Sequence, residues 1–203
     1  KRGYYVFRMG VNVEKKFISN NPKVIDYANS NFRSSFMDVY LGTKCFFCIS
    51  TGTGFDFLAY FSRRPIAYSG HTPIGHFHTY TKKNMHLPQH HILKKEKRKL
   101  SLTEIFAHGL GFALHSKDYE EKGVEVVQNT PEEIKDLVLE MLEYLEFNKK
   151  LDPIDEELQK SFRKLYVINL KRFYRVDENY ILHSEILSRM SSKFLRENKY
   201  WLQ

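Results

Sequence analysis

Residues 45–68 limit the possible folds more than any other part of the chain. The apolar run 45–49 is typical of a strand, and a turn with two glycines follows at 50–54. A helical stretch then extends through Phe61, and residues 65–68 form a second strand-like run. Strand, turn, helix and strand within about 25 residues predict a βαβ unit, which joins parallel neighbouring strands. We therefore expect an open parallel sheet covered by helices.

Strand and helix patterns also alternate along the rest of the chain. Short β-rich runs occur at 4–8, 24–27 and 124–127, and we expect the last of these to be the final strand. The first predicted helix is 34–41, with a stop at Gly42, and a short helix is opened by the capping box 101–104 and ended by Gly109. Another starts at Thr130-Pro131, with Thr130 and Glu133 as its capping box, and two more are predicted at 155–175 and 180–197. The order predicts an α/β fold with helices on both faces of the sheet and additional C-terminal helices.

Length and composition agree with a globular cytoplasmic protein. The 203 residues are 42% hydrophobic and 28% charged, which excludes a disordered, charge-dominated chain. No apolar run reaches the ~18–20 residues needed to span a bilayer. The two cysteines, Cys45 and Cys48, suit a reducing compartment and are expected to pack on opposite faces of a buried strand. The chain begins without Met and its fourth residue is already strand-like, so we expect it to be part of a longer protein.

The turn Ser50, Thr51, Gly52, Thr53, Gly54 has residue types that suit a phosphate or diphosphate. It follows an apolar strand and enters a helix, at the carboxyl edge where open parallel sheets bind ligands. Glycines let backbone N–H groups approach an anion, and a helix N-terminus favours negative charge. The pattern is neither the Walker A motif nor G-x-G-x-x-G, which disfavours both of those families. A tight, capped β–α turn without a ligand remains the alternative.

An ordered set of short motifs resembles a bacterial glycosyltransferase family associated with surface-polysaccharide genes. Residues 41–56 and 64–75 are similar to the C-terminal, nucleotide-sugar-binding half of GT-B glycosyltransferases. The further matching pieces are 3–10, 24–28, 32–38, 100–106, 129–134 and 193–202. Together, the pieces cover nearly the whole chain.

This resemblance implies two facing Rossmann-like domains in a complete enzyme, of which this chain is the donor-binding half. It implies a Rossmann-like domain at 1–150 and a helical extension at 151–203, which packs on that domain or back toward a missing N-terminal domain. The implied reaction transfers a sugar from a nucleotide sugar to a hydroxyl of a glycan or lipid-linked acceptor, in cytoplasmic synthesis of a bacterial surface glycan. No metal or other cofactor is implied, because GT-B enzymes typically need none.

The resemblance also assigns roles to individual residues. The implied donor-binding residues are Arg8, Asp26, Ser50, Thr51, Gly52, Thr53, Gly54, Asp56, Thr72, Pro73, Ile74 and Gly75. The turn 50–54 would face the diphosphate, Arg8 would pair with phosphate, and residues 72–75 would line the nucleotide pocket. Asp56 is the one candidate for a catalytic contact. No general base is assigned, because in this fold it commonly comes from the other half.

Six of the nine histidines lie within residues 71–91, namely His71, His76, His78, His86, His90 and His91. No Cys, Asp or Glu lies among them, which argues against a metal site. The surrounding segment 69–100 has no clear periodicity, and we expect a mobile loop that orders partly when donor or membrane is present. We expect its histidines to be solvated, with contact to the donor as the alternative.

The run at 94–99 contains five basic residues, Lys94, Lys95, Lys97, Arg98 and Lys99, in a chain of net charge +8. Such a run is either a solvated face or a peripheral contact with the anionic inner face of a membrane. Nucleic acid is not expected as a partner, because no aromatic interleaving or binding motif accompanies the run. For the chain as a whole, a non-catalytic nucleotide- or anion-binding module remains the alternative function.

Overall fold

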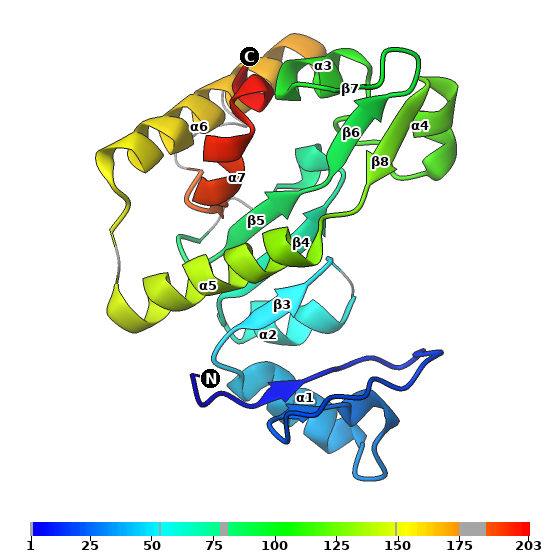
Figure 1. Ribbon diagram of the computed structural model, residues 1–203, viewed down its shortest axis with the longest axis vertical. Helices are drawn as coiled ribbons and strands as arrows, with labels where there is room; N and C mark the ends of the chain where they lie inside the picture. Colours follow the sequence, from blue (N-terminus) through cyan, green and yellow to red (C-terminus); the bar gives the residue numbers. More distant parts are fainter. Residues whose placement is uncertain (1, 53, 78–80, 149, 175–185) are drawn as a thin grey trace. The chain divides into compact units, whose positions relative to one another are not determined.

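The computed structural model describes residues 2–52, 54–77, 81–148, 150–174 and 186–203, which Figure 1 shows as a ribbon. The chain forms two compact units. The first unit consists of Lys1–Cys48 and Thr53–Pro65, and the second of Ile49–Gly52 and Ile66–Gln203. Residues 151–203, predicted as an extension of a domain at 1–150, thus belong to the same unit as 66–150.

The first unit contains two short parallel strands and two packed helices. Its elements are β1 (Val6–Phe7), β2 (Val24–Ile25), the 3₁₀ turns η1 (Tyr27–Asn29) and η2 (Gly54–Asp56), α1 (Ser35–Lys44) and α2 (Phe57–Phe61). The predicted end of α1 at Gly42 is wrong, because the helix continues to Lys44. Gly42 is buried against α2, where an added Cβ would lie 2.7 Å from Leu58 Cβ. The missing side chain therefore lets the helices pack closely.

The second unit is built on a parallel sheet, as the βαβ pattern predicts. β3 (Cys48–Ser50), β4 (Ile66–His71), β5 (Met85–Pro88) and β9 (Arg189–Met190) form four parallel strands in that order. β3 begins three residues later than predicted, and Phe46 and Ile49 are 44% and 46% exposed. The expectation of a buried strand from residue 45 is therefore wrong. The coarse prediction of an α/β fold with a parallel sheet is confirmed.

A second, antiparallel sheet was not expected. Its order is β7–β6–β8, with β6 at His90–Leu93, β7 at Arg98–Lys99 and β8 at Val124–Val127. β8 is therefore not the final strand of the chain, because β9 follows it. Segment 69–100 was expected to be one irregular loop, but it contains β5, β6 and β7. These strands are two to four residues long, too short to give a clear alternation in the sequence.

The helices of the second unit are α3 (Leu102–Ala107), α4 (Ser116–Glu121), α5 (Pro131–Phe147), α6 (Pro153–Tyr174) and α7 (Ser192–Glu197), with 3₁₀ turns η3 (Ile74–His76) and η4 (Lys199–Leu202). The predicted capping boxes at the starts of α3 and α5 are confirmed. The predicted helix 180–197 is wrong in part, because residues 189–190 form β9 and the helix starts only at Ser192. Residues 180–185 lie outside the described ranges.

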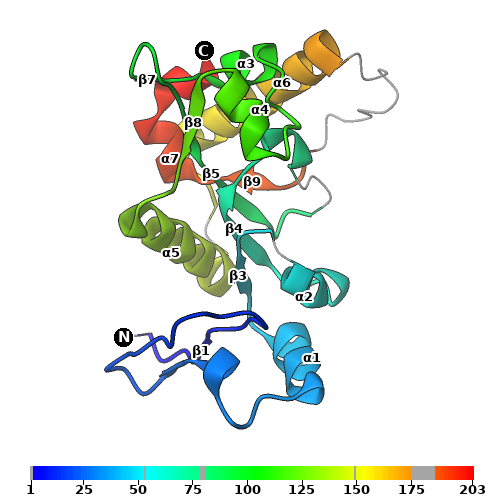
Figure 2. The same cartoon turned by 90° about the vertical axis from the view of Figure 1, so that its right-hand side faces the viewer.

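Aromatic side chains join the C-terminal elements to the rest of the second unit. Trp201 of η4 stacks on Phe162 of α6 with ring centroids 5.8 Å apart, and Phe162 meets Phe77 edge-on at 5.2 Å. α5 runs along β4 and β5 in both views of the ribbon (Figures 1 and 2). Within the described ranges, no helix has both the length and the apolar character needed to cross a membrane.

Candidate functional site

The turn after β3 leaves its backbone accessible. Ser50 is buried, and its Oγ accepts a hydrogen bond from the Gly52 N–H at 3.0 Å. Thr51, Gly52 and Gly54 are exposed, and Thr53 lies outside the described residues. Gly52 has a φ of +81°, which explains why it is glycine. Gly54 has an ordinary φ, and no described atom outside its chain neighbours lies within 4 Å of its Cβ position.

Polar groups gather at the carboxyl ends of β3, β4 and β5, in what we call the polar edge: Ser50, Ser69, Gly70, Gln89 and Asn129. Ser69 Oγ donates to the Ser50 carbonyl at 3.5 Å. Asn129 is nearly buried; its Oδ1 accepts from the Gly70 N–H at 3.0 Å and its Nδ2 donates to the Pro88 carbonyl at 2.9 Å. Asn129 therefore ties the ends of β4 and β5 together.

Gly70 and Asn129 were not predicted as site residues. Gly70 has a φ of +66°, and a Cβ there would lie 3.8 Å from Gln89 Nε2 and 3.9 Å from Gln128 Oε1. The side-chain amides of Gln89 and Gln128 therefore lie beside the position where Gly70 has no side chain. The sequence signal for Asn129 is its position immediately before Thr130, the residue that caps α5.

Residues 72–75, predicted to line a nucleotide pocket, are mostly part of the core. Pro73 and Ile74 are buried, and only Thr72 and Gly75 are half-buried. The Gly75 N–H donates to the Gly111 carbonyl at 2.6 Å, and the Gly75 carbonyl accepts from Tyr166 Oη at 2.9 Å. A Cβ on Gly75 would lie 2.5 Å from the Gly111 oxygen. Packing therefore explains this glycine without a ligand.

Arg8 and Asp26 lie in the first unit and bind each other, with Arg8 Nη1 3.3 Å from Asp26 Oδ1. Arg8 also donates to the Lys15 carbonyl at 2.7 Å, and Asp26 accepts from the Phe17 N–H at 2.8 Å. The Phe17 bond, with contributions from Asn29 and Arg8, outweighs desolvation and lowers the pKa of Asp26. The pair thus holds the loop 15–17 in place.

Asp56, the candidate for a catalytic contact, is 7% exposed at the start of α2. Burial raises the pKa of the nearby Cys48 thiol to about 12, with smaller contributions from Cys45 and from the charge of Asp56. Burial also raises the pKa of Cys45. Both cysteines are half-buried thiols outside any disulfide, and both are protonated at neutral pH.

The expectation of solvated histidines is wrong for four of the six. His71, His86, His90 and His91 are between 0% and 9% exposed, because they lie on or beside the short strands β4, β5 and β6. His76 is exposed, and His78 lies outside the described ranges. His90 Nε2 lies 2.7 Å from Glu133 Oε1. In the part of the chain that the structure describes, no group of three or more His, Cys, Asp or Glu is placed to hold a metal ion.

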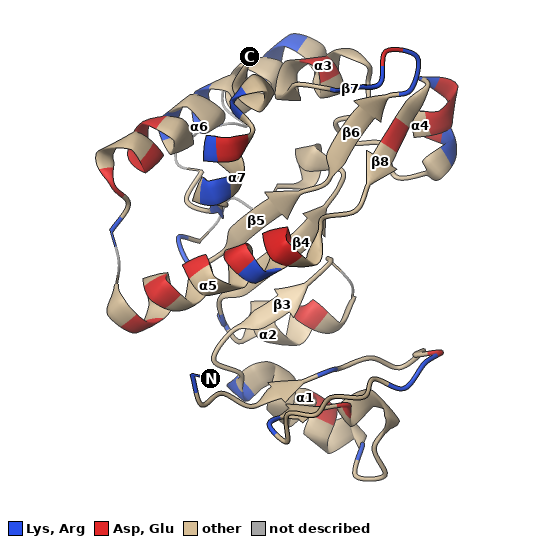
Figure 3. Cartoon of the chain, in the orientation of Figure 1, with Lys and Arg blue, Asp and Glu red and all other residues tan. Residues whose placement is uncertain are grey.

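The basic run 94–99 covers the β6–β7 turn at 94–97 and strand β7, where Figure 3 shows Lys and Arg concentrated. Arg98 pairs with Glu96 at 2.6 Å and Glu104 at 2.8 Å. Lys99 Nζ lies 3.5 Å from Asn198 Oδ1 and 5.9 Å from the centre of the Tyr200 ring. Part of the positive charge of this run is therefore compensated within the protein.

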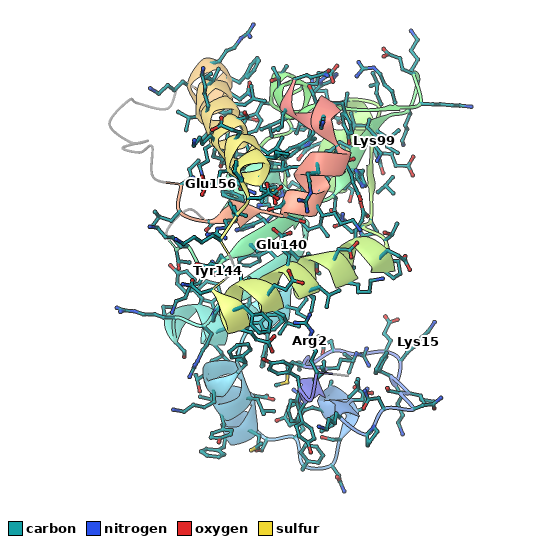
Figure 4. All side chains as sticks on the ribbon, turned by 60° about the vertical axis from the view of Figure 1, so that its left-hand side comes forward. Arg2, Lys15, Lys99, Glu140, Tyr144 and Glu156 are labelled. Atoms are coloured by element: carbon teal, nitrogen blue, oxygen red, sulfur yellow. The ribbon has the colours of Figure 1, made fainter. Side chains whose placement is uncertain are left out.

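The α5–α7 contact has a structural role. Glu140 points from α5 toward α7, where its carboxylate accepts from Ser191 Oγ at 3.1 Å and the Ser192 N–H at 3.0 Å (Figure 4). Arg189 lies over the ring of Tyr144 at 4.3 Å. A cavity nearby, lined in part by Glu133, has a volume of about 10 Å³, enough for one water molecule. This contact is too closed to bind a nucleotide.

Comparison with known proteins gives no relative: no protein-family model, curated protein or solved structure matches this chain. The function therefore has to be inferred from the chemistry of the turn and the polar edge.

Proposed function

We propose that this chain is the donor-binding half of a GT-B-type glycosyltransferase and that its turn 50–54 binds the diphosphate of a nucleotide sugar. Gly54 is the main support for this proposal. It is exposed, its φ does not require glycine, and among the described residues no atom outside its chain neighbours lies within 4 Å of its Cβ position. A ligand that approaches the backbone closely gives a reason for glycine at such a position.

The chemistry of the surrounding residues suits the donor. The turn follows a strand of a parallel sheet, and its Gly54 N–H and Thr51 Oγ1 are proposed as donors to phosphate oxygens. The Gly52 N–H already donates to Ser50 Oγ and would have to exchange this partner for a phosphate oxygen. Gln89 and Gln128, next to Gly70, are proposed to hydrogen-bond the nucleoside. Arg8 has no part in this proposal, because Asp26 already pairs with its guanidinium group.

In the proposed reaction, an acceptor hydroxyl attacks the anomeric carbon of the sugar and loses its proton to a base. The bond between that carbon and the diphosphate oxygen breaks, and a nucleoside diphosphate leaves. The N–H groups of the turn stabilise the negative charge that develops on the leaving diphosphate. The role proposed for this chain is to bind the donor and to stabilise its leaving group.

Replacing Gly54 by Ala tests the proposal. We expect the affinity for a nucleoside diphosphate to fall at least about tenfold, or about 1.4 kcal/mol, because the new methyl group occupies the space of the phosphates. The affinity for the nucleoside alone should stay within about twofold, and the melting temperature should not change, because the substitution strains no backbone. Isothermal titration calorimetry and thermal melting measure both effects.

Gly52→Ala has a matched control in Gly123→Ala. Both glycines have a positive φ, +81° and +64°, with open space at the Cβ position. Each substitution should therefore cost about 1–2 kcal/mol of stability. Only Gly52→Ala should also weaken binding of the nucleoside diphosphate. Unchanged diphosphate affinity in both Gly52→Ala and Gly54→Ala would remove the turn from the binding site.

A non-catalytic binding module is the second candidate, and one observation favours it. Asp56 is the only carboxylate between residues 50 and 72, and it is buried. This stretch therefore offers no exposed general base. A binding module needs none, whereas a transferase would have to take its base from the other half of the enzyme. The two candidates differ in turnover: the transferase releases nucleoside diphosphate from the sugar donor when acceptor is present, whereas a binding module releases none.

A further inference from the structure

The outer faces of α1 and α2 are apolar, although both helices are exposed. Six large side chains on them are between 38% and 73% exposed. We call this set the aromatic face: Phe36, Val39, Tyr40, Phe57, Tyr60 and Phe61. Single exposed apolar residues are ordinary on protein surfaces, but six on two packed helices indicate an interaction site.

The spacing of the aromatic face is the same on both helices. Phe36, Val39 and Tyr40 of α1 stand at positions i, i+3 and i+4, as do their counterparts on α2, so each set forms one stripe. The Phe36 and Tyr40 rings stack with centroids 6.1 Å apart. The two helices pack together through other residues, Gly42 and Leu58. The aromatic face is therefore not used to hold the helix pair together.

Positive charge accompanies the aromatic face. Lys44 follows Tyr40 by one helical turn, and Arg63 and Arg64 follow Phe61 after one intervening residue, Ser62. Arg64 Nε also donates to the Thr43 carbonyl at 2.7 Å. The two acidic residues within 31–65 are compensated or buried: Asp38 lies 3.9 Å from Arg33 Nη2, and Asp56 is 7% exposed. The first unit has ten Lys and Arg against four Asp and Glu, a net charge of +6 out of +8 for the chain.

We propose that the aromatic face binds the surface of an anionic lipid bilayer. The Phe and Tyr rings enter the headgroup region, where aromatic side chains are favoured, and Lys44, Arg63 and Arg64 contact lipid phosphates. A second copy of this chain is a poorer occupant, because it would bring two units of charge +6 together. The proposal is independent of nucleotide binding.

The β6–β7 turn, the site predicted for membrane contact, lacks the apolar part of such a surface. The residues flanking its lysines, Leu93 and Leu100, pack into a core cluster with Ile105 and Val124. This turn therefore offers charge without exposed apolar side chains. The lysines of the turn serve as a charge control in the test of the aromatic face.

Sedimentation with lipid vesicles tests the proposal. Without nucleotide, the protein should bind phosphatidylcholine vesicles that contain about 30% phosphatidylglycerol at least tenfold more strongly than vesicles of phosphatidylcholine alone. The double variant Phe36→Ser, Phe61→Ser should lose at least tenfold in affinity for the anionic vesicles, about 1.4 kcal/mol. The matched control Phe147→Ser removes a Phe of similar exposure, 70% against 73%, from α5 and should change nothing.

Two further variants separate insertion from charge attraction. Phe61→Trp should place an indole in the bilayer, so brominated lipids should quench its fluorescence, whereas Phe147→Trp should show no quenching. The only native tryptophan, Trp201, is 2% exposed and gives the same background in both. The triple variant Lys94→Gln, Lys95→Gln, Lys97→Gln should keep vesicle affinity within about twofold of the unmodified chain.

Three results would overturn the proposal. The first is equal binding to both kinds of vesicle, or to neither. The second is an equal loss in the Phe36/Phe61 and Phe147 variants. The third is a concentration-dependent dimer that the Phe36/Phe61 variant abolishes in a protein that does not sediment with vesicles, which would make the face a protein interface. Circular dichroism confirms that each variant is folded.

Discussion

At the scale of single residues, the buried histidines act as flat rings in the core. His86 is fully buried, and its ring centroid lies 4.2 Å from that of Phe77 and 4.7 Å from that of Tyr68. His91, which is 2% exposed, has a pKa lowered from 6.5 to about 4, mainly because burial disfavours the charged ring. Burial thus favours the neutral form of the His91 ring.

His91 therefore links stability to pH. The unfolded chain protonates this ring near pH 6.5, but the folded chain does so only near pH 4. Between these values the unfolded state holds more protons, so the free energy of unfolding should fall as the pH drops from 6.5 to 4, by about 3 kcal/mol in total. Urea unfolding at several pH values measures this loss.

Two histidine variants check this assignment. The His91→Gln variant lacks the titrating group. Over the same pH range, its free energy of unfolding should therefore fall by about 3 kcal/mol less than that of the unmodified chain. His76→Gln changes an exposed histidine and should keep the original pH dependence. An unchanged pH dependence in His91→Gln would show that other groups cause the acid destabilisation.

The glycines show what sequence can and cannot predict about the site. Gly52, Gly54 and Gly75 were assigned to the donor site in the same way, yet they differ in the structure. Gly75 is required by the approach of the Gly111 carbonyl, Gly52 by its positive φ, and only Gly54 has no such internal reason. The contact between Gly75 and Gly111, which is 36 positions away, cannot be recognised from the local sequence.

At the scale of secondary-structure elements, Asn129 holds β4 and β5 together at the proposed site. Replacing Asn129 by Ala leaves the Gly70 N–H and the Pro88 carbonyl without this partner. Each unsatisfied buried group costs about 1–3 kcal/mol, so we expect the free energy of unfolding to fall by about 2–4 kcal/mol. Chemical denaturation measures the change.

Gln128→Ala is the control for this effect. Gln128 is adjacent in sequence but exposed, so its loss should change stability by less than about 0.5 kcal/mol. Equal effects of the two substitutions would contradict the role given to Asn129.

Elements with local signals were predicted well, and elements that depend on distant contacts were not. α5 begins at Pro131 with Thr130 as its N-cap, as predicted, because its capping box and Pro131 lie within four residues of sequence. β5 and β6 were missed, because each has only four residues. β5 also pairs with β9, about a hundred residues later, and β6 pairs with β8 as well as with the nearby β7. Gly42 was mistaken for a helix end because its contact with Leu58 is a tertiary one.

At the scale of the whole molecule, charge is divided unevenly. The second unit has 22 Lys and Arg against 20 Asp and Glu, whereas most of the net positive charge belongs to the first. Composition alone predicted a basic protein but directed attention to the run 94–99, which is partly neutralised by Glu96 and Glu104. The surface that combines charge with exposed aromatic rings became visible only once the two helices were placed together.

The central claim, that the turn 50–54 binds a diphosphate, is tested most directly by nuclear magnetic resonance. Titrating the isotope-labelled chain with a nucleoside diphosphate should shift the backbone amide signals of Gly52 and Gly54 most strongly, with smaller shifts at Gly70 and Gln89. The amides of residues 94–99, which are also close to positive charge, should not move. Saturable shifts confined to 94–99, or none at Gly52 and Gly54, would contradict the account.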